Sequence, residues 1–241
     1  MIHSLVVGGT RGIGREVVRR FAVEGHQVSA IGRSPPASEE ERLPNVRHFQ
    51  ADVAGTEIDA VLDEVLGLGM LRYLVFCQRH RGPGDAWAGE CLTSLTATKH
   101  IIERLAPAFA PEGDRAIVLV SSIVSRLVAD EQDVSYHVAK AGLNQMARFY
   151  AVRLGPAGIR VNTVSPSVFI KEESSAFYRQ HPELTDLFGK ITPLRRMGTA
   201  SEIASAIRFL ASPQASFVTG QDLVVDGGIS LQAQASLARQ L

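Results

Sequence analysis

A tyrosine and a lysine four residues apart are the first side chains in this sequence that could do chemistry. Tyr136 and Lys140 fall on one face of a predicted helix, because residues i and i+4 of a helix are neighbours. A free tyrosine has a pKa near 10, and a neighbouring ammonium favours the phenolate and lowers that pKa. Such a pair can exchange a proton with a carbonyl oxygen near neutral pH. The pair is common in proteins, so its meaning depends on its surroundings.

Two serines come shortly before this pair. Ser121 and Ser122 end an aliphatic run that predicts a buried strand, and Ser122 lies 14 residues before Tyr136. A serine hydroxyl at this place could hydrogen-bond a substrate oxygen while negative charge develops on it. We expect Ser122 to have this role, and Ser121 is the alternative. The structural alternative is a plain strand end followed by a surface tyrosine.

A glycine-rich turn near the N-terminus predicts a phosphate-binding site. Gly8, Gly12 and Gly14 stand where an apolar run passes into an amphipathic segment, that is, between a strand and a helix. Glycines let the backbone approach a pyrophosphate, and the helix N-terminus offers free N–H groups and the positive end of the dipole. The turn therefore predicts a dinucleotide site, with a merely tight turn as the alternative.

The residues after the second predicted strand favour NADP over NAD. An acidic residue there would hold the ribose 2′-hydroxyl of NAD, but the strand ends in Gly32, Arg33 and Ser34. The guanidinium of Arg33 suits a 2′-phosphate, and Arg11 inside the glycine turn is a second cation within reach. Each arginine alone could be a solvated surface residue, but together they lead us to expect NADP(H).

These residues need a scaffold of alternating strands and helices, and the sequence predicts one. Apolar runs predict strands over residues 2–7, 27–31, 46–50, 71–77, 116–120, 159–164 and 223–225. Periodic segments predict helices over residues 13–24, 58–66, 85–109, 135–154 and 201–210. Such alternation indicates an α/β chain with a mainly parallel sheet covered on both faces. Residues 165–198 show no such pattern, and an irregular stretch of this length is typical of a lid.

The motifs resemble those of the short-chain dehydrogenase/reductase family along nearly the whole chain. Residues 7–14 resemble the family's Thr-Gly-x-x-x-Gly-Ile-Gly, with Val7 in place of the threonine. Residues 158–162 and 165–166 resemble the strand and loop beside the nicotinamide. Residues 193–198, 217–221 and 226–228 resemble the family's C-terminal third.

This resemblance implies one NADP-binding, Rossmann-like, doubly wound domain over residues 1–241, with about seven strands and a substrate-binding lid over 165–198. It implies interconversion of a ketone and a secondary alcohol by hydride transfer, and the most similar members reduce 3-oxoacyl thioesters on acyl carrier protein. The implied catalytic residues are Ser122, Tyr136, Lys140 and Ser94. The implied cofactor contacts are Gly8, Thr10, Arg11, Gly12, Ile13, Gly14, Arg33, Ser34, Asp52, Val53, Tyr136, Lys140, Pro166 and Val168.

Several positions depart from the family pattern. Residues 76–79, Phe-Cys-Gln-Arg, replace the family's Asn-Asn-Ala-Gly, so Arg79 is either a contact to cofactor or anionic substrate or part of a solvated loop. Ser94 replaces an asparagine that holds a water between the lysine and solvent. Ser167 replaces a glycine, and Lys171 lies near a usual threonine. An enzyme and a non-catalytic NADP-binding or assembly protein therefore both remain open.

Composition excludes some classes of partner. The chain has 241 residues with 25 basic and 25 acidic side chains, so no net field attracts nucleic acid or an anionic membrane. No apolar run has the length of a membrane span, and two cysteines cannot form an all-cysteine zinc site, so we expect no metal and a cytoplasmic protein. The family resemblance implies a homodimer or homotetramer. Aromatic residues that could line the substrate pocket are Phe169, Phe177, Tyr178 and Phe188; the alternative is packing of the lid against the core, which is favoured for Phe188.

Overall fold

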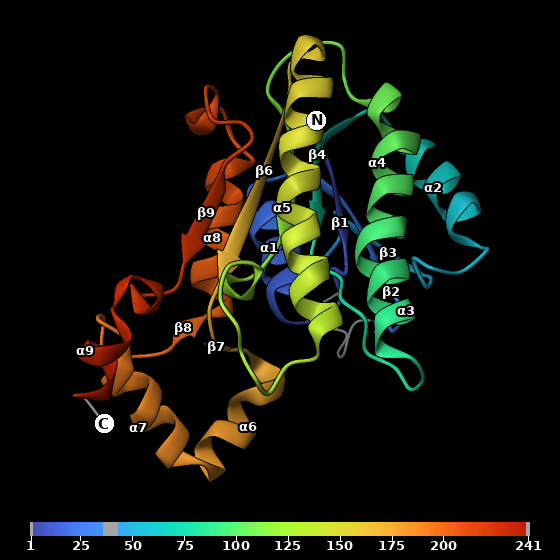
Figure 1. The fold of residues 1–241 in the computed structure, drawn as a ribbon. Coiled ribbons are helices and arrows are strands. Elements are labelled where there is room, and N and C mark those ends of the chain that lie inside the picture. The colour runs from blue at the N-terminus through green and yellow to red at the C-terminus, as the bar shows by residue number, and fades with distance from the viewer. Residues whose placement is uncertain (1, 36–42, 240–241) are drawn as a thin grey trace.

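Seven strands form one parallel sheet in the computed structural model, which describes residues 2–35 and 43–239 (Figure 1). In the order in which they lie side by side, they are β3 (Val46–Gln50), β2 (Gln27–Gly32), β1 (His3–Val7), β4 (Leu71–Phe76), β5 (Arg115–Val120), β6 (Ile159–Pro166) and β9 (Asp222–Val225). Every pairing within this sheet is parallel. The predicted doubly wound α/β fold is confirmed.

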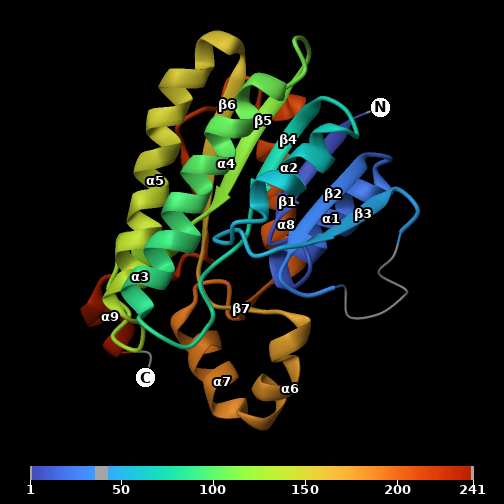
Figure 2. The same cartoon turned by 90° about the vertical axis from the view of Figure 1, so that its right-hand side faces the viewer.

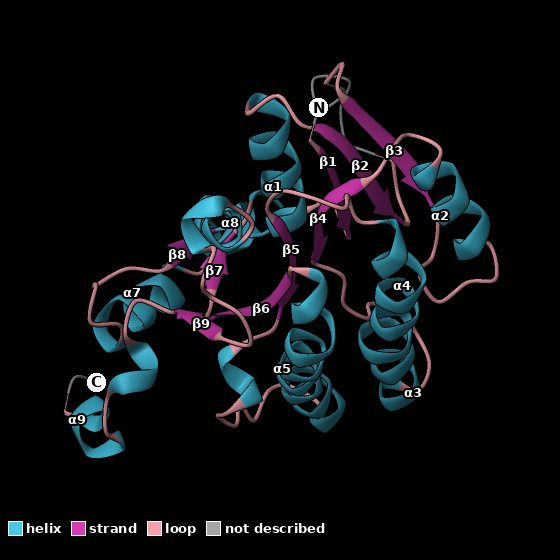
Figure 3. Ribbon diagram, turned by 90° about the horizontal axis from the view of Figure 1, so that it is seen from above, coloured by secondary structure: helices cyan, strands magenta, loops and turns pink. Residues whose placement is uncertain are grey.

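Helices cover both faces of the sheet, as Figure 3 shows from above. One face packs against α1 (Gly12–Val23) and α8 (Ala200–Leu210), and the other against α2 (Ile58–Leu66), α4 (Ala97–Leu105) and α5 (Val134–Leu154). Alternate residues of one strand therefore enter different cores. Leu5 and Val7 pack toward α2 and α4, whereas Val6 packs toward α1, and all three are fully buried. Burial on both faces explains why the strands read as unbroken apolar runs.

The predicted helix over residues 85–109 is interrupted by a wider helical turn. It consists of α3 (Ala86–Glu90), a π-helical segment (Cys91–Thr96), α4 and a 3₁₀ turn (Ala106–Ala108). The side chains of Glu90 and Ser94 are both buried at this junction. Single π-turns inside helices are often found at functional sites, and this one turns two polar side chains inward.

The expectation of an irregular stretch over residues 165–198 is wrong, because this stretch contains two helices. After the short strand β7 (Phe169–Ile170) come α6 (Glu172–Gln180) and α7 (Pro182–Ile191), and then β8 (Gly198–Thr199), which pairs with β7. Neither helix has a buried residue, although Leu184, Leu187, Phe188 and Ile191 of α7 follow the i, i+3, i+4, i+7 spacing of an amphipathic helix, a signal that the prediction did not use. Pro182 occupies the first turn of α7, where its missing N–H has no cost.

Helices α6 and α7 lie beyond the carboxyl ends of the central strands, as Figure 2 shows. This edge of the sheet is where the order of strands reverses between β1 and β4, the usual place for a ligand in a doubly wound fold. The chain ends in α9 (Gln234–Ala238) beside α7 (Figure 1). No helix among residues 2–35 and 43–239 has the length and apolarity needed to cross a membrane. Most of the predicted surface loop over residues 34–44 lies outside the described residues.

Candidate active site

A cavity of about 570 Å³ opens at the carboxyl edge of the sheet and is partly covered by α6. Its volume is in the range of cofactor pockets. The predicted cofactor residues that line it are Gly8, Thr10, Arg11, Gly12, Ile13, Arg33, Ser34, Asp52, Val53, Tyr136, Lys140, Pro166 and Val168. The cavity thus brings the glycine turn, the ends of β2 and β3, and the Tyr–Lys pair together.

The glycine turn leaves no space for larger residues. Gly8 has φ of +78°, and a Cβ there would lie 2.6 Å from the backbone nitrogen of Gln78. Gly14 does not line the cavity; it packs behind the turn, where a Cβ would lie 2.0 Å from the Gly8 carbonyl oxygen. Helix α1 begins at Gly12 with no hydrogen bond from the side chain of its N-cap residue, so its N-terminus can bind an anion. These residues fit the pyrophosphate of a dinucleotide.

A carboxylate from the lid already contacts this anion site. The N–H of Gly12 donates to Oε1 of Glu173 at 3.1 Å. Arg15, which is buried, lies 3.3 Å from the same oxygen and 2.7 Å from Oε2 of Glu172. Burial acts to raise the pKa of Glu173, but backbone hydrogen bonds and the charges of Arg15 and Lys171 outweigh it and hold that pKa below its usual range. Glu173 is therefore ionised at neutral pH.

The cations expected at the 2′-phosphate lie at the far end of the cavity. Arg11 and Arg33 are exposed and line it, and Nη2 of Arg33 donates to the carbonyl of Arg81 at 2.8 Å. Asp52 also lines the cavity, and its Oδ1 accepts the N–H of Ala54 at 3.0 Å. Asp52 does not cap the following helix, because α2 begins only at residue 58 and has Glu57 at its N-cap position.

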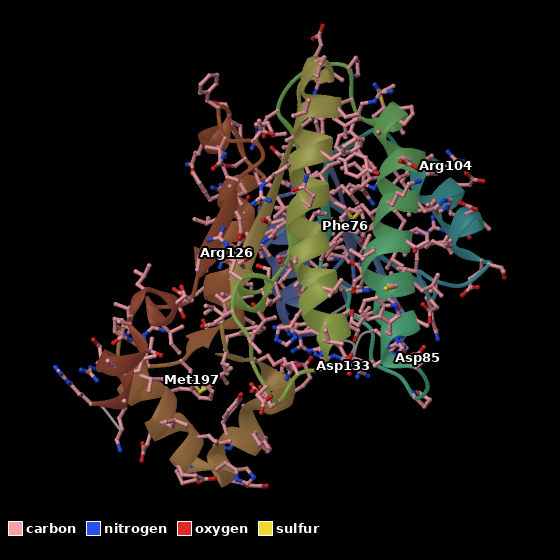
Figure 4. The ribbon with its side chains drawn as sticks, in the orientation of Figure 1. Phe76, Asp85, Arg104, Arg126, Asp133 and Met197 are labelled. Carbon is pink, nitrogen blue, oxygen red and sulfur yellow. The ribbon has the colours of Figure 1, made fainter. Side chains whose placement is uncertain are left out.

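Lys140 is buried beside Tyr136 on α5. Its Nζ donates to the carbonyl of Val120 at 2.9 Å and lies 5.5 Å from the centre of the Tyr136 ring. Burial lowers the pKa of Lys140 to about 8, although the nearby carboxylate of Glu90 acts to raise it. The side chain of Asp133 caps the N-terminus of α5, and that of Asp85 caps the N-terminus of α3. Figure 4 labels both residues and shows that these two helix ends lie near each other.

Tyr136 is influenced by a cation that the sequence analysis did not assign to it. Burial raises the pKa of Tyr136, and the charge of Arg79 and the hydroxyl of Ser122 act to lower it. The Cζ atom of Arg79 lies 4.3 Å from the centre of the tyrosine ring. The sequence predicted that Lys140 would lower this pKa, but the main lowering charge is that of Arg79.

The two candidate serines have different hydrogen bonds. Ser121 lines the cavity, but its hydroxyl donates to the carbonyl of Lys140 at 2.9 Å. Ser122 donates to the carbonyl of Pro166 and accepts the N–H of Val124, both at 3.4 Å. These longer bonds leave the Ser122 hydroxyl freer to exchange its partner for a substrate oxygen.

Ser94 lies below the cavity floor rather than in it. Its side chain is fully buried, and its hydroxyl donates to Oε2 of Glu90 at 2.6 Å. The other oxygen of Glu90 lies 4.0 Å from Nε of Arg79. Sequence reasoning missed Glu90, although its spacing of four residues from Ser94 on a predicted helix was a usable signal.

The lid contributes fewer aromatic side chains than expected. Phe169 and Tyr178 line the cavity together with Lys171. The ring of Phe177 instead packs against those of His181 and Tyr178, with centroids 4.4 and 5.3 Å away. Phe177 and Phe188 are not among the residues that line this cavity. Within the described chain, no group of three His, Cys, Asp or Glu side chains could hold a metal ion.

Known proteins resemble this chain over nearly its whole length. A family model described as enoyl-(acyl carrier protein) reductase matches residues 7–230. The chain is 29% identical to the 3-oxoacyl-[acyl-carrier-protein] reductase FabG of Staphylococcus epidermidis, over 94% of this chain and 98% of that protein. It is 30% identical to the L-tagatose-forming galactitol 2-dehydrogenase of Cereibacter sphaeroides, over 95% of this chain and 94% of that protein.

Solved structures share the fold over almost the whole length. Aldohexose dehydrogenase of Thermoplasma acidophilum matches with a TM-score of 0.85 at 25% identity, over 97% of this chain and 95% of that chain. A structure titled as ElxO with NADP bound matches with a TM-score of 0.80 at 24% identity, over 96% of this chain and 99% of that one. The similar proteins thus include enzymes named for very different substrates.

Proposed function

This chain belongs to the short-chain dehydrogenase/reductase family of oxidoreductases, and we propose that it uses NADP(H) to interconvert a ketone and a secondary alcohol. A 3-oxoacyl thioester is one candidate substrate class, because FabG is among the similar proteins. The observation that supports the proposal best is the cavity itself. It has an anion-binding glycine turn at one end and Tyr136 and Lys140 at the other.

The side chains of this site can divide the proton chemistry among themselves. A bound nicotinamide supplies or accepts a hydride at the substrate carbon. Tyr136 donates a proton to the carbonyl oxygen in the direction of reduction. The Ser122 hydroxyl holds that oxygen while charge develops on it, and buried Lys140 holds the cofactor ribose. Helix α6 partly covers the cavity and contributes Glu173, Ser174 and Tyr178 to its lining.

The choice of NADP is supported by charge. No carboxylate follows directly after β2, whereas Arg33 and Ser34 stand there and Arg11 lines the same end of the cavity. Among the described residues that line the cavity, Asp52 is the acidic residue closest in sequence to Arg33. Its carboxylate accepts the N–H of Ala54. A 2′-phosphate would meet two guanidinium groups here.

The activity is tested by the loss of reduced-cofactor absorbance in the presence of 3-oxoacyl thioesters and small ketones. Tyr136→Phe should reduce turnover by about 10²–10⁴-fold, because the phenol supplies the proton. Tyr150→Phe is the matched control, since this tyrosine lies on the same helix but is buried against α4, where it donates to Glu103 at 3.1 Å and does not line the cavity. Equal rates for wild type and Tyr136→Phe over a broad panel would remove the support for an enzyme.

Cofactor choice is tested by binding. Arg33→Ala should lower the affinity for NADPH at least about tenfold and leave that for NADH nearly unchanged, because only NADPH carries the 2′-phosphate. Arg47→Ala, at an exposed arginine of β3 that pairs with Glu64, should leave both affinities unchanged. An unchanged ratio in Arg33→Ala would contradict the assignment.

A non-catalytic NADP-binding or assembly protein is the second candidate. It is favoured by Ser94, which stands where the family has an asparagine and bonds Glu90 rather than Lys140. NADPH binding without turnover of any carbonyl substrate would support this reading. For either function we propose a homodimer or homotetramer, and the cytoplasmic location stays a prediction.

A further inference from the structure

A buried acid that is close enough to influence both residues of the candidate catalytic pair is hydrogen-bonded to a buried serine. Glu90 and Ser94 are 4% and 0% exposed, and they form a 2.6 Å hydrogen bond in the π-helical turn. A carboxylate at such a position is costly to bury unless it has charged and hydrogen-bonding partners. Ser94 is its hydrogen-bond partner, and the charged partner is Arg79 at 4.0 Å.

Arg79 connects this buried pair to the site. Its Nε faces Glu90, while its Cζ lies over the ring of Tyr136 at 4.3 Å, within the range of a cation–π contact. The Arg79 side chain is 36% exposed and lines the cavity, so its guanidinium lies between the buried carboxylate of Glu90 and the open cavity. The guanidinium thus lies between the carboxylate of Glu90, an ion-pair distance away without a hydrogen bond at Nε, and the ring of Tyr136.

We propose that Arg79, held in place by Glu90 and Ser94, is a positioning cation that stabilises the phenolate of Tyr136 when its proton passes to the substrate. In the proposed reduction, the O–H bond of Tyr136 breaks, its proton joins the substrate oxygen, and hydride from reduced cofactor joins the substrate carbon. The electron pair of the broken bond stays on the phenolate oxygen. The positive charge of Arg79 favours that anion.

Lys140 is less suited to this task here. Its amine is completely buried and donates to Val120, and with a pKa of about 8 it is partly neutral above neutral pH. An arginine stays protonated under all such conditions. The charged groups that face Tyr136 are Arg79 and Arg81 from the loop after β4, Glu90 from α3 and Lys140 from its own helix. Arg79 has the largest effect of these in favour of the phenolate.

The inference rests on the proposed function for its chemical step, but its test needs no substrate. The four tyrosines of the whole chain are replaced biosynthetically by 3-fluorotyrosine, which titrates at lower pH than tyrosine. Each ring then gives a ¹⁹F resonance whose shift reports ionisation. The signal of residue 136 is assigned by its loss in Tyr136→Phe, and its titration is followed in each variant.

Arg79→Met should move the titration of residue 136 upward by about one pH unit, because the phenolate loses its nearest favourable charge. Arg79→Lys should keep most of the wild-type value. The double variant with Glu90→Gln, which leaves no unpaired buried acid, should titrate between wild type and Arg79→Met, since Glu90 itself disfavours the phenolate. If Arg79→Met alone fails to fold, the titration of residue 136 in the double variant still tests the proposal.

The matched control is Arg47→Met, because Arg47 also lies over an aromatic ring, that of Phe49 at 4.9 Å, and also pairs with a glutamate. It should leave residue 136 unchanged. A titration that stays within about 0.2 unit of wild type in both Arg79→Met and the double variant, or that moves downward, overturns the proposal. Absence of hydride transfer with the expected shifts would instead count against the proposed function alone.

Discussion

Lys140 illustrates at the scale of one residue how a functional group can oppose stability. Its charged amine is buried, and burial lowers its pKa to about 8 from an ordinary value of 10.5. Lys140→Met should therefore raise the free energy of unfolding at pH 7 by about 1–2 kcal/mol, after allowance for the donor that the Val120 carbonyl loses. Thermal melting should show an increase of about 3–6 °C.

The pH dependence of this gain follows from the direction of the pKa shift. Between about pH 8 and 10.5 the unfolded chain binds more protons at Lys140 than the folded chain does, so the stability of the wild type rises with pH there. The advantage of Lys140→Met should be largest at pH 7 and shrink toward pH 10. If the difference in the free energy of unfolding between Lys140→Met and wild type is the same at every pH, the packing of the methionine side chain, and not the loss of the buried charge, causes it.

Individual site residues were predictable from the sequence to different degrees. Tyr136, Lys140 and the glycine turn follow from local spacing on a helix and at a strand end, and the structure brings them to one cavity. The pairing of Arg79 with Glu90 joins a loop to a helix 11 residues away, and no local pattern fixes such a contact. The departure of Arg79 from the family pattern was visible, but its partner was not.

At the scale of the element, the N-terminus of α6 competes with the cofactor for the N-terminus of α1. The Glu173 carboxylate accepts from Gly12 at 3.1 Å, where a pyrophosphate oxygen would bind. Two anions cannot share one donor without repulsion, so cofactor binding requires Glu173 to move. Glu173→Gln should tighten NADPH binding about threefold to tenfold in a calorimetric or fluorescence titration.

Glu172→Gln is the matched control for this contact. Glu172 also pairs with Arg15, at 2.7 Å, but its carboxylate does not bond Gly12. Its substitution should change NADPH affinity less than that of Glu173. Weaker binding in Glu173→Gln would mean that the carboxylate supports the cofactor site instead of competing for it.

The ionised Glu202 carboxylate at the N-terminus of α8 should make the free energy of unfolding depend on pH. Thr199 and Glu202 form a capping box, and Arg196 donates to both oxygens of Glu202, which lowers the pKa of Glu202 to about 2. A lowered carboxyl pKa stabilises the fold above about pH 4.5, and this contribution is lost as the pH falls toward 2. Because the groups are partly exposed, Glu202→Gln should cost about 0.5–1 kcal/mol at pH 7. Chemical unfolding of both proteins should converge near pH 2.

Elements could be predicted where burial leaves a strong pattern. The central strands are buried on both faces and read as apolar runs, so β1, β4 and β5 were predicted to within a residue or two. Helices α6 and α7 lie at the edge, bury no residue fully and were missed as helices. The π-helical turn at residues 91–96 was also missed, because a widened turn has no sequence signature of its own.

At the scale of the whole molecule, the zero net charge hides a local excess. Cations from separate elements, among them Arg11, Arg33, Arg79 and Lys171, line one cavity at one edge of the sheet. This placement concentrates positive potential where a phosphate-rich cofactor would enter, while acids elsewhere on the chain balance the sum. Fold topology, rather than composition, therefore creates the field at the site.

Exposed apolar residues on the outer face of α5 lead us to expect that two copies of the chain associate through this helix. Val138, Phe149 and Val152 lie along this face and are 42%, 60% and 81% exposed, a stripe that a monomer would leave in water. Burying it against a second copy would stabilise a symmetric dimer, so Phe149→Glu should shift the protein toward monomer in sedimentation velocity at micromolar concentration. Phe217→Glu, which alters a fully exposed phenylalanine outside this stripe, is the control and should leave the assembly unchanged. A wild type that sediments as a monomer, or a Phe149→Glu variant that keeps the wild-type mass, would contradict this interface.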